Sequence, residues 1–320
     1  MHRMYSVKRL LIPRHLAAAN LVLMVVGLSA GVHAQESQSS KVATATPPLA
    51  SAATRDIQLN LGLQFDDNVT RAGDSSVALN DQIYSFDLSK RLIFSVSENT
   101  RARLTFNLGA NHFRRFDGLS HLVEGVQGEL QYRASAAFGA PTFAIFASVS
   151  AEQFSSKLRD NYRYAVGLSV QQALTDRISY FGALSHQHRD AQNAVFTNTD
   201  NSARLNLDYA FNPNSTLYFG AEYRRGDIVT TTTPAAENAR IATALVLDDD
   251  AFPGKGLTSY RFDGQSVLTT IGYNVSLNAH SAVDFSWRRI RSFPDLGATL
   301  TTISSNYVAN QFSIVYLVRF

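Results

Sequence analysis

Hydrophobic and polar residues alternate with a period of two along most of the chain after residue 55. The first such segment places five apolar side chains on one face: Ile57, Leu59, Leu61, Leu63 and Phe65. The residues between them are polar or glycine. Successive side chains of a strand point to opposite faces, so the pattern predicts strands with one apolar and one polar face. About twelve such segments follow one another, the last at residues 312–320, which favours an all-β fold.

The connections between these predicted strands alternate in length. Short ones with turn residues lie near residues 98–99, 139–141, 175–176, 212–214 and 278–279. Longer polar ones span residues 66–81, 114–121, 155–161, 190–200, 226–260 and 292–304. Membrane barrels sort their connections in this way, with short periplasmic turns and longer extracellular loops. We therefore predict an antiparallel transmembrane β-barrel of about 12 strands over residues 56–320, in contact with outer-membrane lipid.

The last predicted strand is the most regular one. Its apolar face carries Phe312, Ile314, Tyr316, Val318 and the terminal Phe320. This strand resembles the C-terminal recognition strand of Gram-negative outer-membrane proteins. The resemblance implies an outer-membrane location and a contact with the barrel-assembly machinery, for which Phe312, Tyr316 and Phe320 are the signal residues.

The N-terminal 34 residues have the layout of a cleaved secretory signal. Four basic residues flank an apolar stretch from Leu16 to Leu28, and Val32 and Ala34 are small residues before a cleavage point. A membrane anchor is the alternative, but the apolar stretch is shorter than the roughly 20 residues that a spanning helix needs. Residues 35–55, rich in Ser, Ala, Thr and Pro, are expected to form a flexible periplasmic lead-in.

Composition excludes several kinds of site. The chain has no cysteine, so disulfides, thiolate metal sites and lipid attachment through cysteine are absent. The 29 Lys and Arg residues exceed the 26 Asp and Glu residues, but four of the basic residues belong to the signal. The remaining charge is close to neutral, so we expect no nucleic-acid partner. No cofactor or metal motif is recognisable.

If the apolar faces contact lipid, the polar faces line the barrel lumen. They carry about ten arginines against six carboxylates, an excess that favours anionic solutes. We predict that the following residues line the lumen and set selectivity: Arg101, Arg103, Arg133, Arg163, Arg204, Arg224, Arg288, Glu129, Glu222 and Asp208. The alternative is that these charges neutralise one another as cross-strand ion pairs.

The longest loop, residues 226–260, is the candidate gate or plug. Pro234 can begin a short helix over the residues that follow it. Leu245, Val246 and Leu247 are expected to pack into the barrel mouth because they are too apolar for open water. The acidic run Asp248, Asp249 and Asp250 suggests a divalent cation site, against which stands a solvated acidic loop without an ion.

One cluster suggests catalysis. Ser185, His186, His188 and Asp190 lie near the predicted outer rim. Nucleophilic chemistry needs a serine within hydrogen-bond reach of a histidine. Ser185 and His186 are adjacent on one strand and point to opposite faces, so we expect no enzyme.

Two local features qualify the barrel prediction. Lys90 has the parity of the lipid-facing residues, so it either extends toward the periplasm or marks a bulge at Lys90 and Arg91. Residues 62–71, with Asp66, Asp67 and Asn68, resemble the opening hairpin of barrels from exopolysaccharide-export systems and of some barrels that assemble surface lipoproteins.

Together these features predict a narrow channel for an anionic solute, an acidic oligosaccharide or an exopolysaccharide strand. The second hypothesis is a non-conducting barrel that anchors or assembles a surface structure. The third is an outer-membrane hydrolase.

Overall fold

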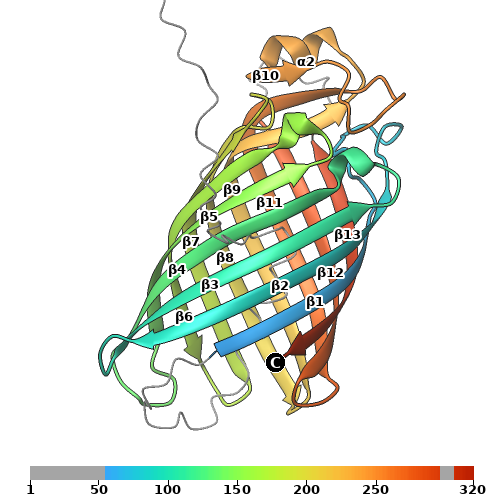
Figure 1. Ribbon diagram of the computed structural model, residues 1–320. Coiled ribbons are helices and arrows are strands. Elements are labelled where there is room, and N and C mark those ends of the chain that lie inside the picture. The colour runs from blue at the N-terminus through green and yellow to red at the C-terminus, as the bar shows by residue number, and fades with distance from the viewer. Residues whose placement is uncertain (1–54, 296–305) are drawn as a thin grey trace, which may run out of the picture.

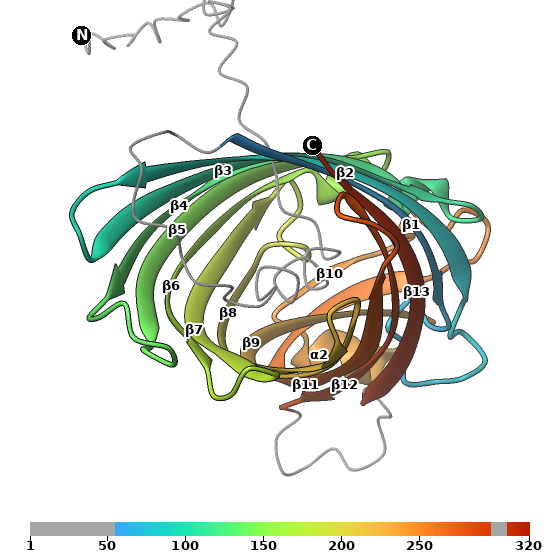
Figure 2. The same cartoon turned by 90° about the horizontal axis from the view of Figure 1, so that it is seen from below.

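The chain forms a closed antiparallel β-barrel. The computed structural model describes residues 55–295 and 306–320. Within them, twelve strands pair with their neighbours around a ring that closes between β1 and β13 (Figures 1 and 2). The strands are β1 (Arg55–Asp66), β2 (Asp81–Ser95), β3 (Thr100–Phe113), β4 (His121–Arg133), β5 (Thr142–Phe154), β6 (Asn161–Ala173), β7 (Ile178–Ala191), β8 (Asn198–Asn212), β9 (Ser215–Thr232), β11 (Thr258–Ser276), β12 (Ser281–Pro294) and β13 (Tyr307–Arg319).

Small additional elements lie in the long loops. Two 3-10 turns, η1 (Asp117–Leu119) and η2 (Lys157–Arg159), follow β3 and β5. The helix α2 (Ala236–Ile241) begins just after Pro234, as the sequence predicts. The short strand β10 (Ala244–Val246) pairs with the part of β11 that extends beyond β12. Figure 1 shows α2 and β10 at the end of the barrel opposite the C-terminus.

The predicted fold class is confirmed, and the connections have the predicted alternation. Short turns close one end of the barrel, and the loops before β2, β4, β6, β8 and β11 lie at the other. The first of the described residues, Arg55, already belongs to β1. The predicted signal, residues 1–34, and the rest of the predicted lead-in fall outside the described residues. No helix in the described part of the chain is long and apolar enough to cross a membrane.

The outer face of the barrel is apolar along most of its height. Leu61, Leu184, Ile145, Phe219 and Ile271 are all between 44% and 62% exposed. A water-soluble monomer rarely exposes such a continuous apolar surface. The exposed face therefore contacts lipid, and backbone hydrogen bonds closed into a ring satisfy every strand inside the bilayer.

The interior is polar and, toward the end with the short turns, filled by side chains. Buried residues there include Gln58, Asn60 and Asn274. Tyr218 lies across Gly272 and donates a hydrogen bond to the buried carboxylate of Asp284, with 2.8 Å between the oxygens. A Cβ atom at Gly272 would lie 2.1 Å from the Tyr218 ring, so only glycine leaves room for this ring against the inner face of β11.

Lys90 faces outward without a bulge. The pairing of β2 with both β1 and β3 runs without a shift through Lys90 and Arg91, so of the two alternatives the bulge is wrong. Lys90 is exposed and pairs with Ile57, close to the periplasmic end of β1. At that depth a long side chain reaches the interface, where lysine costs far less than at the midplane.

Candidate functional site: the lumen and its cap

Inward-facing side chains from most of the strands enclose a cavity of about 560 Å³. Because alternate residues of each strand face inward, the cavity wall takes its chemistry from one parity of the sequence. Seven of the ten predicted lumen residues line it: Arg103, Glu129, Arg163, Arg204, Glu222, Arg224 and Arg288. A ring of twelve strands is narrower than that of the 16- to 18-stranded porins, so these side chains occupy much of the cross-section.

The other three predicted residues lie outside this cavity, nearer the periplasmic turns. The Arg101 Nε donates to the Gln131 side chain at 2.7 Å. Arg133 donates to the backbone carbonyl of Ala137 in the following turn. Asp208 is buried. Parity placed these residues on the correct face but gave no information on depth.

Several wall arginines are paired with carboxylates, which is the alternative that the sequence left open. Arg103 on β3 forms an ion pair with Glu129 on β4. Arg163 on β6 lies 2.6 Å from the nearly buried Glu152 on β5, and Arg189 on β7 approaches the same carboxylate at 3.5 Å. Arg224 pairs with Glu222 along β9 at 2.5 Å. The Arg103–Glu129 and Arg163–Glu152 pairs link neighbouring strands, and all of these pairs hold the guanidinium groups in place.

Pairing with carboxylates behind the wall leaves only a small positive excess around the cavity. Eight arginines line the cavity against four carboxylates, Glu129, Asp200, Glu222 and Asp227. Three further carboxylates, Asp66, Glu152 and Asp249, lie behind the wall and pair with Arg71, Arg163 and Arg159. Much of the remaining wall consists of hydroxyl and amide groups: Ser148, Ser150, Ser169, Ser185, Ser202, Ser266, Gln127, Gln187, Gln265, Gln311 and Asn198. The cavity is therefore a polar, positively biased space with many neutral hydrogen-bonding groups.

Two aromatic residues that the sequence pattern did not single out face the lumen. Phe146 and Phe181 line the cavity, and the Arg204 guanidinium lies over the Phe181 ring at 5.0 Å from its centre. Both residues occupy positions of their strands that alternate onto the polar, inward face. An aromatic residue at such a position is the sequence feature that could have identified them. Stacking restricts the Arg204 side chain, and the electron-rich face of the Phe181 ring attracts its positive charge.

Loops from opposite walls meet over the extracellular mouth. Phe116, in the loop between β3 and β4, contacts Phe252, in the loop between β9 and β11, with ring centres 5.2 Å apart. Those two strand pairs lie on opposite sides of the ring. Ala251 and Leu257 complete the buried cluster, against which Val69, Val77, Leu79 and Leu119 also pack. We call these loops and their cluster the cap; Phe252 reaches from it into the outer end of the cavity.

A buried ion pair joins the longest loop of the cap, residues 233–257, to η2, which we include in the cap. Arg159 in η2 donates to both oxygens of Asp249, at 2.6 and 2.5 Å. The Arg159 guanidinium also lies 4.0 Å from the centre of the Phe196 ring. Asp249 accepts further hydrogen bonds from the Ser259 hydroxyl and the Ala251 N–H. Burial alone would raise the pKa of Asp249, but the hydrogen bonds and charge of Arg159 outweigh it and hold this pKa below its usual range.

The predicted packing of the apolar run in this loop is not what the structure shows. Leu245 and Leu247 are 39% and 66% exposed, and Val246 lies between them in β10. Pairing with β11 satisfies the backbone of this segment at the rim, so its side chains stay outside the mouth. Phe252 takes the inserted position instead.

The acidic run has a structural role in the cap. Arg159 occupies both oxygens of Asp249, and Asp250 accepts a hydrogen bond from Ser156. Asp248 is exposed and adopts a left-handed backbone, with φ of 48°. The three carboxylates therefore do not converge on one point, and no group of potential metal ligands occurs among residues 55–295 and 306–320.

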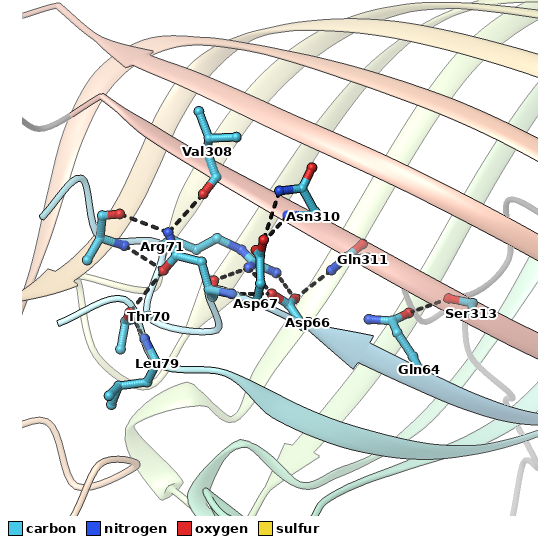
Figure 3. Close-up of polar contacts among 12 residues, drawn as sticks. Gln64, Asp66, Asp67, Thr70, Arg71, Leu79, Val308, Asn310, Gln311 and Ser313 are labelled. Atoms are coloured by element: carbon cyan, nitrogen blue, oxygen red, sulfur yellow. Dashed lines mark hydrogen bonds and ion pairs between the residues drawn. The ribbon is translucent and has the colours of Figure 1, made fainter. Parts of the chain in front are cut away.

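The segment that resembles exopolysaccharide-export barrels secures the closing seam of the barrel (Figure 3). Asp66 receives two hydrogen bonds from Arg71 and one from Gln311 on β13. Asp67 accepts two from Asn310, and the Asn68 side chain donates to the Val308 carbonyl. These contacts join the end of β1 and the loop that follows it to β13.

The histidine cluster has no catalytic geometry. Ser185 faces the lumen, where its hydroxyl bonds with Ser202 at 2.8 Å. His186 and His188 face outward and bond with Asn201 and Thr199 on β8. Serine and histidine therefore lie on opposite faces of β7, as predicted. The terminal strand has its predicted orientation too: Phe312, Tyr316 and Phe320 are exposed on the outer face.

Comparison with known proteins identifies the fold. No protein-family model matches this chain, and no curated protein sequence does. An outer-membrane channel from Pseudomonas putida F1 is similar in structure, with a TM-score of 0.54 and 10% identity over 85% of this chain and 97% of the channel. This likeness shows the fold, a closed antiparallel β-barrel of the outer-membrane type. More distant likenesses are a KdgM porin in complex with disordered oligogalacturonate (TM-score 0.41, 11% identity, 82% of this chain and 99% of the porin) and the NanC porin (0.43, 8%, 81% and 98%).

Proposed function

We propose that this barrel is a narrow outer-membrane channel for an anionic solute, with an acidic oligosaccharide or exopolysaccharide strand as cargo. The observation that carries the proposal is the cavity wall, which exposes eight arginines and four carboxylates, with three further carboxylates paired to these arginines from behind it. A confined, weakly screened space concentrates ions of the opposite sign. Planar guanidinium groups also hold carboxylates through two parallel hydrogen bonds.

The neutral part of the wall supports a glycan as cargo. Serine hydroxyls and amide side chains alternate with the arginines along the strands. Such groups exchange hydrogen bonds with sugar hydroxyls at little cost, because each can donate or accept. Phe146 and Phe181 add apolar surface for a sugar ring.

The loop of residues 233–257 is the proposed gate. Phe252 lines the outer end of the cavity, and the Arg159–Asp249 pair holds the loop that carries it. Passage of a chain-like solute requires this loop to move. The same closed cap also favours the second hypothesis, a non-conducting barrel whose outer loops bind a surface structure.

The selectivity part of the proposal is tested by reversal potentials in a salt gradient across a planar bilayer. We expect anion selectivity. We expect Arg103→Ala to lower the anion-to-cation permeability ratio about twofold or more, because it removes a positive charge and leaves the negative charge of Glu129 without its partner. Arg101→Ala is the matched control: it removes an arginine from the same face of β3, but outside the cavity. Glu129→Gln should shift the ratio in the opposite direction.

The cargo is tested by current block. An acidic hexuronate oligosaccharide should block the channel at lower concentration than a neutral oligosaccharide of equal length, and Arg103→Ala should reduce the difference. Cation selectivity, or a ratio that Arg103→Ala and Glu129→Gln leave unchanged, refutes the charge filter. If neither the wild type nor a variant with a broken Arg159–Asp249 pair conducts, the non-conducting barrel is the correct function.

A further inference from the structure

Two arginines on β12 face the membrane instead of the lumen. Arg288 and Ile290 line the lumen cavity, so the alternation of the strand directs Arg289 and Arg291 outward. Trp287, the next residue on the same outer face, borders an apolar hollow on the lipid side together with Phe285, Phe312 and Ile314. The arginines therefore continue a lipid-facing row of aromatic residues toward the extracellular end.

Both arginines lie close to the extracellular end of β12. β12 ends at Pro294, so a strand rise of about 3.3 Å and a tilt of about 40° place Arg291 and Arg289 roughly 8 and 13 Å below that end. Tryptophan prefers the membrane interface, and Trp287 lies directly below both. An arginine at the lipid midplane costs several kcal/mol, but near the interface the cost almost vanishes.

Neither guanidinium has a protein partner within residues 55–295 and 306–320. The buried Nε of Arg289 has no hydrogen bond, and no ion pair or side-chain hydrogen bond joins either arginine to another described residue. Their neighbours on β11 and β13 are uncharged: Thr269, Asn310, Val267 and Val308. Asp67, one strand further, is engaged with Asn310. The wall arginines Arg103, Arg163 and Arg224, by contrast, are all paired with carboxylates.

We propose that Arg289 and Arg291 bind the phosphate groups of a glycolipid in the outer leaflet. The two side chains are two residues apart on one strand face, about 7 Å, so both can engage a phosphorylated sugar headgroup. Guanidinium forks match phosphate geometry and form charge-assisted hydrogen bonds with it. Trp287, Val267 and Val308 supply the apolar surface beside the charges.

The extracellular position selects the glycolipid over a phospholipid. The outward arginines lie at the same end of the barrel as the long loops and α2, and this end faces the leaflet that carries phosphorylated glycolipid in Gram-negative outer membranes (Figure 1). Lys90, at the periplasmic end of the same outer face, has no second cation beside it on β2. The site is on the lipid side of the wall, so it does not depend on whether the lumen conducts.

Trp287 is the only tryptophan in the chain and reports on this site directly. Purified protein in detergent is titrated with bis-phosphorylated lipid A, and Trp287 fluorescence is recorded. We expect a saturable change whose midpoint rises about tenfold for each arginine replaced by alanine, the usual effect of a charge-assisted hydrogen bond. Arg289→Lys and Arg291→Lys, which keep the charge but lose the fork, should fall between.

Arg225→Ala is the matched control. Arg225 lies on β9 at the same extracellular end and is 61% exposed, but it is already paired with Asp295 at 3.1 Å. Its removal should change the midpoint less than about twofold. Folding of each variant is checked by its heat-dependent gel migration. If the double alanine variant does not fold, Arg291→Gln, at an exposed position, provides the comparison.

Three outcomes overturn the proposal. Equal binding by the wild type and the double variant removes the arginines from the site. Equal binding of lipid A and its dephosphorylated form shows that phosphate is not recognised. Equal or tighter binding of phosphatidylglycerol assigns the site to phospholipid instead.

Discussion

Arginine has different roles in the cap of this barrel and on its wall. Arg159 in the cap is 9% exposed, and its carboxylate partner Asp249 is fully enclosed. Arg103 on the wall has a partner as well, but its guanidinium borders an open polar cavity. In the cap the charges neutralise each other and fix a loop. On the wall the surplus charge is available to a solute, because it borders an open polar cavity.

Replacing Asp249 with alanine should have the largest effect. It leaves Arg159 buried without a partner, which typically costs about 3–5 kcal/mol. We expect the loop of residues 233–257 to detach while the barrel stays folded, so trypsin should cleave at Arg240 and Lys255. Asp248→Asn is the control, since Asp248 is the exposed neighbour in sequence and asparagine tolerates its left-handed backbone. Equal cleavage rates in the two variants would show that the ion pair does not hold the loop.

Acid should release the cap of the wild type. The pKa of Asp249 is lowered in the folded protein, so the pair contributes its full stability above about pH 4, the unfolded pKa, and loses it as the pH falls through the folded value. We expect conductance to rise, and pepsin to cut the loop faster, below about pH 4. Asp249→Asn should remove this dependence. A wild-type response that this variant keeps would assign the titration to another group.

Removing the wall arginine should have the smallest effect on stability. Arg103→Ala also leaves a carboxylate, Glu129, without its partner, but the adjoining cavity lets water solvate it. We expect a loss of about 1–2 kcal/mol, measured as a shift of the heat-dependent gel transition, below the loss from Asp249→Ala. A loss as large as at Asp249 would mean that wall and cap arginines are equally structural.

The alternation of residues along each strand was sufficient to predict the barrel. A period of two predicts every strand of the ring and the inward parity of Arg103, Arg204 and Arg288. The residues between these strands predict the order of short and long connections. The same parity placed Arg101 and Asp208 on the inner face, although neither reaches the cavity. Depth along the barrel axis depends on strand tilt and register, and single strands do not encode either.

The cap was beyond the reach of any local pattern. Leu245, Val246 and Leu247 were the most apolar residues of the long loop, so hydropathy selected them for burial, yet β11 offered an unpaired edge that draws them to the rim. Phe252 is inserted because it packs against Phe116 from the opposite wall. Arg159 had no visible signal, since its partner Asp249 is 90 residues away in sequence.

The sequence alone therefore determined which residues face lipid, which face the lumen and which end carries the long loops. These are consequences of backbone geometry, which repeats every two residues and at every turn. The tertiary structure decided which loops meet across the mouth, how deep each inward charge lies and which arginines have partners. Those relations arise only when the ring closes, because closure brings together residues from opposite walls that are distant in the chain.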